Sequence, residues 1–102
     1  MTKRFKIQSL LDKQVIILDG ATGTELQSKG MPAGVCPEVW CLENQTVIQD
    51  VHASYQKAGA QVVYTCTFGA NRFKLKQYGV KKDVYSVNLE LARLAKQACG
   101  KK

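Results

Sequence analysis

The stretch VIILDGATG, residues 15–23, decides the fold that the sequence predicts. Its first four residues are all apolar and three of them are β-branched. Such a run, without polar alternation, is typical of a strand covered on both faces, as in a parallel sheet. Gly20 and Gly23 allow the backbone that follows to turn tightly and to approach a ligand closely. We therefore expect a buried strand over residues 15–18 that ends in a binding turn.

A second apolar run, VVYT at residues 62–65, predicts a second strand. Between the two runs, apolar residues at helical spacing predict a helix that begins near Asn44 or Thr46 and ends at Gly59. This connection is long enough for a right-handed crossover between parallel strands. Both strands would then end at the same edge of the sheet, where α/β folds place their chemistry.

The remaining segments predict further helices around this pair of strands. Short helices are expected over residues 5–11, 24–29 and 72–78, and a longer amphipathic helix over residues 84–99, with Asp83 as N-cap. Residues 30–44 contain Pro32, Gly34 and Pro37 and are expected to form loops. The predicted fold class is α/β, in one domain or part of a domain that spans residues 1–102.

Length and composition indicate an ordinary globular chain. Its 102 residues are 45% hydrophobic and 23% charged, and no uninterrupted run of 18 apolar residues exists to cross a membrane. The basic start resembles a signal peptide only superficially, because Asp12, Lys13 and Gln14 interrupt the apolar stretch that would form its core. A cytoplasmic protein is expected.

The net charge of +7 is concentrated in the last third of the chain. From Arg72 onward, nine basic residues face only Asp83 and Glu90. Clustered basic residues can bind nucleic acid, but these lack interleaved aromatic residues and match no groove-reading motif. A solvated helical face is the favoured interpretation, and binding to nucleic acid is not expected.

Four cysteines, Cys36, Cys41, Cys66 and Cys99, occur without the close pairing of a zinc site. They are expected to be reduced thiols that pack as small apolar side chains. The single histidine, His52, lies inside the helix predicted before Gly59, where a packing role is favoured over a catalytic one.

The predicted turn carries groups that suit an amino-acid ligand. The carboxylate of Asp19 can face an ammonium group, while the backbone N–H groups around Gly20 and Ala21 can bind a carboxylate. The alternative is that Asp19 only shapes the turn by bonding its own backbone.

Hydroxyl and amide groups follow the second predicted strand. Thr65 and Thr67 point the same way in an extended strand end and can line a pocket, although β-propensity alone also explains threonine there. Asn71 can orient a ligand, and capping the next helix is its alternative role.

Taken together, four ordered motifs carry a family resemblance. They are DGATGTELQ at residues 19–27, CPEVW at 36–40, VHASYQKAGA at 51–60 and TCTFGANRFKL at 65–75. The chain resembles the amino-terminal part of the homocysteine S-methyltransferase family, which includes the homocysteine-binding module of cobalamin-dependent methionine synthase and betaine-homocysteine methyltransferase. The resemblance covers residues 15–79 and extends more loosely to residue 100. Gln45 departs from it, because a proline commonly stands near this position.

The resemblance implies a (β/α)8 TIM barrel, of which this chain would supply the first two strand–helix units. It further implies zinc held by three cysteines, which activates the homocysteine thiol for methyl transfer. Asp19, Gly20 and Ala21 correspond to the amino-acid-binding turn, and residues 65–71 correspond to the second wall of the pocket. None of the four cysteines falls in the zinc motifs of the family.

A complete barrel takes about 250 residues, so the chain is expected to be a fragment of a longer enzyme or to work with another polypeptide. The predicted function is the amino-terminal portion of a homocysteine S-methyltransferase, inactive alone, with homocysteine and the rest of the barrel as partners. Cobalamin and methyltetrahydrofolate would belong to other domains, and the methyl donor stays open. The alternative is a small, basic, non-enzymatic module that binds nucleic acid or an acidic partner.

Overall fold

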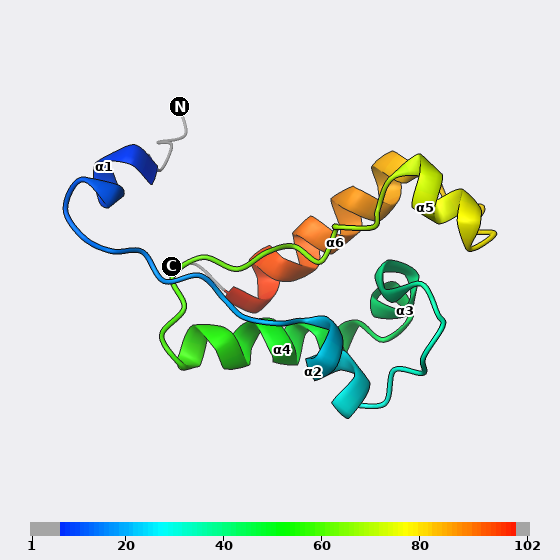
Figure 1. Cartoon of the computed structure of the whole chain (residues 1–102), viewed down its shortest axis with the longest axis horizontal. Coiled ribbons are helices and arrows are strands. Elements are labelled where there is room, and N and C mark those ends of the chain that lie inside the picture. The colour runs from blue at the N-terminus through cyan, green and yellow to red at the C-terminus, as the bar shows by residue number, and fades with distance from the viewer. Residues whose placement is uncertain (1–6, 100–102) are drawn as a thin grey trace.

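Six helices make up the regular structure of residues 7–99, which the computed structural model describes (Figure 1). Their bounds are α1 Ile7–Leu11, α2 Gly23–Ser28, α3 Pro37–Glu43, α4 Gln45–Lys57, α5 Arg72–Gln77 and α6 Val84–Cys99. The helices predicted over residues 44–58 and 84–99 are confirmed. The predicted start of the first helix, at residues 5 and 6, lies outside the described residues.

The predicted α/β fold, with the first two strand–helix units of a TIM barrel, is wrong for this structure. No β-strand is present among residues 7–99, and the two apolar runs meet only at one isolated parallel bridge between Leu18 and Val62. Three backbone hydrogen bonds surround the bridge, including one from Asp19 N to Val62 O at 3.0 Å and one from Gln61 N to Ile17 O at 2.7 Å.

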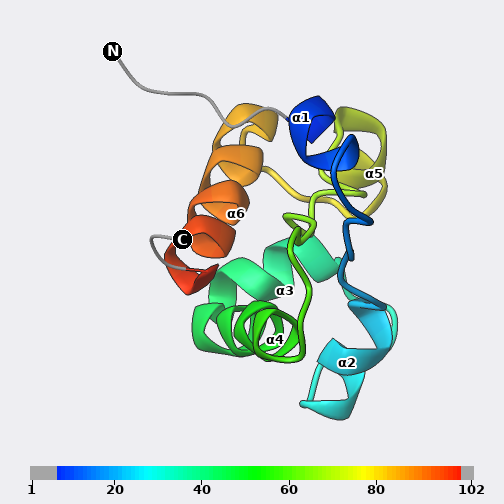
Figure 2. The same ribbon diagram turned by 90° about the vertical axis from the view of Figure 1, so that its left-hand side faces the viewer.

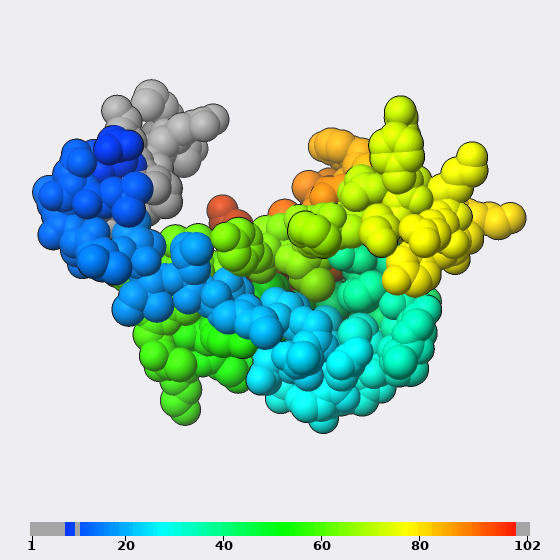
Figure 3. All heavy atoms as spheres, in the orientation of Figure 1, coloured from blue at the N-terminus to red at the C-terminus, as the bar shows by residue number. Residues whose placement is uncertain are grey.

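The reason is that neither run has a neighbour on its outer side. Two paired strands are marginal in water unless a third strand or a packed helix covers them. Val15 is 84% exposed, Ile17 56% and Tyr64 63%, so the residues expected inside a sheet face solvent instead. Figure 3 shows the blue stretch after α1 running along the surface beside the green residues that follow α4.

The direction of the two extended segments agrees with the predicted crossover. Their bridge is parallel, α4 lies in the connection between them, and both continue toward the same side of the molecule (Figure 1). The end of the first segment, at residues 19–22, and the end of the second, at residues 64–68, are thereby brought to the same region.

The core lies between α4 and α6, with α3 packed beside them (Figure 2). Buried residues on each helix recur every three or four positions, which places them on one face. They are Ile48, Val51 and His52 on α4, and Val87, Leu91, Leu94 and Ala95 on α6. Gln49 Nε2 donates to Gln97 Oε1 at 3.1 Å, which links the two helices at their polar edge.

Helix α3 occupies part of a region that was predicted to be loop. Pro37 stands at its first position, where the absent N–H has no helical partner to lose and the fixed φ suits a helix. The proline therefore starts this helix instead of breaking one. Among the described residues, none of the helices is both long and apolar enough to cross a membrane.

Candidate functional site

A cavity of about 580 Å³ lies where the ends of the two extended segments meet α2 and α3. Its lining comes from three parts of the chain: the turn into α2, the first turn of α3, and the second extended segment. The lining residues are Thr22, Gly23, Leu26, Pro37, Glu38, Tyr64, Thr65, Cys66, Thr67 and Phe68. This volume is in the range of small-molecule sites.

Thr65 and Thr67, both predicted as site residues, lie in the cavity wall. Their hydroxyl oxygens are 2.8 Å apart and share a hydrogen bond. The two side chains meet because Cys66 between them adopts a left-handed conformation, with φ of 61°. Their common direction therefore arises from a sharp local bend and not from the alternation of an extended strand.

Asp19 joins the two extended segments and does not line the cavity. Its Oδ2 accepts a hydrogen bond from Tyr64 N at 3.2 Å, and its Oδ1 is buried without a partner among the described residues. The carboxylate thus fixes the backbone just before Thr65 and keeps one unpaired oxygen.

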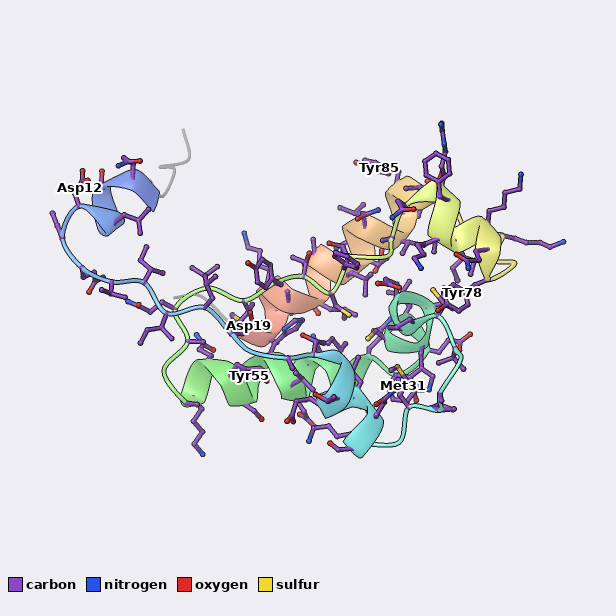
Figure 4. The ribbon with its side chains drawn as sticks, viewed as in Figure 1. Asp12, Asp19, Met31, Tyr55, Tyr78 and Tyr85 are labelled. Atoms are coloured by element: carbon purple, nitrogen blue, oxygen red, sulfur yellow. The ribbon has the colours of Figure 1, made fainter. Side chains whose placement is uncertain are left out.

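The turn at Gly20 and Ala21 packs against Tyr55 of α4. The Tyr55 hydroxyl donates to Ala21 O at 2.6 Å, and a Cβ on Gly20 would lie 3.0 Å from that hydroxyl oxygen. Figure 4 shows Tyr55 directed from α4 toward the segment that carries Asp19. A Cβ at position 20 would therefore force the Tyr55 ring to shift by a few tenths of an ångström.

Asn71 caps α5 and lies outside the cavity lining. Its Oδ1 accepts from Lys74 N at 2.9 Å, which satisfies a free N–H group of the first turn. Asn71 therefore has the capping role that was the alternative to binding a ligand. It lies at the end of residues 65–71, the segment that corresponds to the second wall of the pocket.

Glu38 holds the second wall in place, and the sequence did not single it out as a site residue. Its side chain is only 5% exposed, and its Oε2 accepts from Gly69 N at 2.8 Å while its Oε1 accepts from Cys36 Sγ at 3.4 Å. A Cβ on Gly69 would come within 3.0 Å of both carboxylate oxygens. A signal was present in the sequence, because Glu38 directly follows Pro37 and precedes four apolar residues, Val39 to Leu42.

The four cysteines are free thiols, and two of them lie in contact. Cys41 Sγ of α3 is 3.7 Å from Cys66 Sγ in the cavity wall. Burial raises the pKa of Cys36 and of Cys99. Within residues 7–99, no three His, Cys, Asp or Glu side chains converge so that they could hold a metal ion.

His52 is buried in the core near Asp19, as the packing role predicts. It is 1% exposed, and neither ring nitrogen has a hydrogen-bond partner among the described residues. Burial lowers the pKa of His52 below its usual 6.5, and the negative charge of Asp19 opposes that shift only in part.

We expect this histidine to make the fold sensitive to mild acid. Because the pKa of His52 is lower in the folded chain, the unfolded chain binds a proton at this position at a higher pH, near 6.5, than the folded chain does. The contribution of His52 to the free energy of unfolding is therefore at its maximum above that pH. It decreases below that pH, by at most about 1.4 kcal/mol per pH unit. Urea denaturation between about pH 7.5 and about pH 5.5 should show this loss, and His52→Gln should remove that part of it. Equal pH dependence in both proteins would contradict the prediction.

Comparison with known proteins gives one family. The sequence matches the family model described as homocysteine S-methyltransferase over residues 16–102. It is 33% identical over 107 residues to the homocysteine S-methyltransferase of Escherichia coli (strain K12), an alignment that covers 96% of this chain. It is also 33% identical, over 79 residues and 70% of this chain, to the methionine synthase of Mycobacterium tuberculosis (strain ATCC 25618 / H37Rv).

The matched parts are short relative to these proteins. The chain spans 34% of the length of the E. coli relative and 6% of the mycobacterial methionine synthase. No solved structure matches the chain.

Proposed function

Because this chain belongs to the homocysteine S-methyltransferase family, we propose that its cavity forms part of a homocysteine pocket in an enzyme that makes methionine. One observation carries the proposal: every residue that lines the cavity, from Thr22 to Phe68, falls inside the matched residues 16–102. In the proposed reaction the homocysteine sulfur loses its proton and bonds to the methyl carbon of the donor, while the bond from that carbon to the donor breaks.

The threonine pair supplies the hydrogen-bonding groups of the proposed pocket. Two hydroxyls that share one hydrogen bond still offer one O–H donor and several lone pairs to a ligand. The polar end of an amino acid can use both kinds of group. Leu26 and Phe68 line the same cavity and suit the methylene chain of homocysteine.

The other predicted site residues position this pocket. Asp19 fixes Tyr64 N next to Thr65, and Gly20 and Ala21 hold the turn that leads to Thr22. Asn71 fixes the start of α5 beyond the second wall.

We assign the zinc ligands of the family to residues outside this chain. No metal-binding group of three side chains is found in the part of the chain that the structure describes. We propose that the chain alone does not transfer a methyl group, because none of its four cysteines falls in the zinc motifs that the family resemblance implies. The methyl donor is not assigned, and the expected cytoplasmic location stays a prediction.

Further polypeptide is proposed as the partner of the exposed extended segments. The chain spans 34% of its E. coli relative, and apolar side chains such as Val15, Ile17 and Tyr64 are more than half exposed. Apolar surface of this kind is typical of a face that another segment covers.

The direct test is stabilisation of the chain by L-homocysteine. A ligand that binds only the folded state raises the midpoint of thermal unfolding as its concentration increases. We expect this rise with L-homocysteine and a smaller one with 2-aminobutyrate, which lacks the thiol. No rise at any concentration of homocysteine would contradict the proposal.

The threonine pair can be tested with substitutions that remove only the hydroxyls. Thr65→Val and Thr67→Val should each weaken the binding of homocysteine by about 2- to 10-fold, because each removes a neutral hydrogen bond. Thr46→Val, at an exposed position of α4, is the matched control and should leave binding unchanged. If calorimetric titration gives the same affinity for homocysteine in all three variants, the threonine pair is excluded from the pocket.

A further inference from the structure

The contact between Cys41 and Cys66 joins two parts of the chain that are distant in sequence. Their sulfurs are 3.7 Å apart across a separation of 25 residues, and both are free thiols. Cys41 is fixed on α3 and fully buried, whereas Cys66 lies in the segment that follows the parallel bridge. The fold therefore holds two thiols at contact distance on separate elements.

The two thiols differ in access. Cys66 is partly exposed and lines the cavity of about 580 Å³, which is large enough to admit a small oxidant. Cys41 has no exposed surface and is not among the residues that line the cavity, from which Cys66 separates it. An oxidant that enters the cavity consequently reaches Cys66 first.

The hydrogen bond between the two thiols also favours oxidation of Cys66 before Cys41. With Cys41 as donor, the bond lowers the pKa of Cys66, while burial and the charge of Glu38 act in the opposite direction. The same bond, together with burial, raises the pKa of Cys41. Since the thiolate is the reactive form, Cys66 is the nucleophile of the pair and Cys41 is its partner.

We propose that Cys41 and Cys66 are an oxidation site, which a hydroperoxide converts into a disulfide in the cavity wall. In the first step the Cys66 thiolate attacks one peroxide oxygen, the O–O bond breaks, and the product is a sulfenic acid with release of water or an alcohol. In the second step Cys41 loses its proton and attacks the Cys66 sulfur, which expels water. Two thiols are oxidised and one hydroperoxide is reduced.

Formation of the disulfide would require one of the two elements to move. The sulfurs must close from 3.7 Å to about 2.05 Å, the length of a disulfide bond. Cys41 is held in a helix of the core, while Cys66 belongs to a segment without regular secondary structure. The bond would therefore draw the cavity wall toward α3 and enclose the whole of α4 in a covalent loop. This inference does not depend on which ligand the cavity binds.

Treatment of the folded 102-residue chain with hydrogen peroxide, followed by alkylation of the remaining thiols and peptide mapping, tests the proposal. We expect one intramolecular disulfide between Cys41 and Cys66, with Cys36 and Cys99 alkylated. Dithiothreitol should reverse it. Failure to form this bond, or preferential pairing of Cys36 with Cys41, would overturn the proposal.

Three variants separate this pathway from random oxidation. Cys41→Ser should stop the reaction at a sulfenic acid on Cys66 that dimedone traps, whereas Cys66→Ser should leave Cys41 unoxidised. Cys99→Ser, the matched control outside the pair, should form the disulfide as the unsubstituted chain does. Circular dichroism of each variant identifies any that is unfolded, and the mapping of the unsubstituted chain decides the proposal in every case.

Discussion

Replacement of Leu91 with alanine should lower the free energy of unfolding by about 2–5 kcal/mol. Leu91 has no exposed surface and lies on the face of α6 that packs against α4 and α3. Truncation would leave a cavity in the largest contact between helices. Domains of this size are stable by only about 5–15 kcal/mol, so a loss at the upper end would unfold a large fraction of the molecules.

Urea denaturation followed by far-ultraviolet circular dichroism measures this effect. The matched control is Leu89→Ala on the same helix, because Leu89 is 40% exposed and the change in helix propensity is identical. The control should lose less than about 1 kcal/mol. Similar losses for both variants would show that the contact between α4 and α6 does not form the core.

The second large effect is expected at Glu38. Glu38→Ala would leave the buried N–H of Gly69 without its acceptor, at a cost of about 1.5–3 kcal/mol for that hydrogen bond. The thiol of Cys36 would lose its acceptor as well. Because the lost bond fixes the residues directly after Thr67, the binding of homocysteine should weaken in parallel with stability.

Two further variants isolate the hydrogen bond from other effects of the substitution. Glu38→Gln keeps the shape of the side chain and one oxygen acceptor, so it should recover most of the lost stability. Glu43→Ala removes an exposed acid from the same helix and should change stability by less than about 0.5 kcal/mol. Denaturation curves that coincide for the alanine variants at positions 38 and 43 would refute the anchoring role of Glu38.

Helices α4 and α6 were predictable from the sequence because their signal is local, whereas α3 was missed because the prolines and Gly34 in its region favoured a loop. The spacing of Ile48, Val51 and Tyr55 on α4, and of Val87, Leu91 and Leu94 on α6, repeats within each helix. The strands were not predictable in the same way, since a strand forms only when neighbours pair with it. Residues 15–18 have the composition of a buried strand, but only one bridge is available to them.

The candidate site was predictable in part, for a related reason. Thr65 and Thr67 were found because polar residues at the end of an apolar run are visible in the sequence, and both line the cavity. Glu38 and Tyr55 were missed because their partners, Gly69 and Ala21, come from distant parts of the chain. Asp19 was selected for its charge, yet its observed partner is the N–H of Tyr64.

The close approach of Tyr55 to Gly20 couples these two positions energetically, because a Cβ at position 20 would lie 3.0 Å from the Tyr55 hydroxyl oxygen. An added methyl group would press the ring away by a few tenths of an ångström and strain its hydrogen bond to Ala21 O. A smaller side chain at position 55 would relieve that pressure, so the effects of substitutions at the two positions should not simply add.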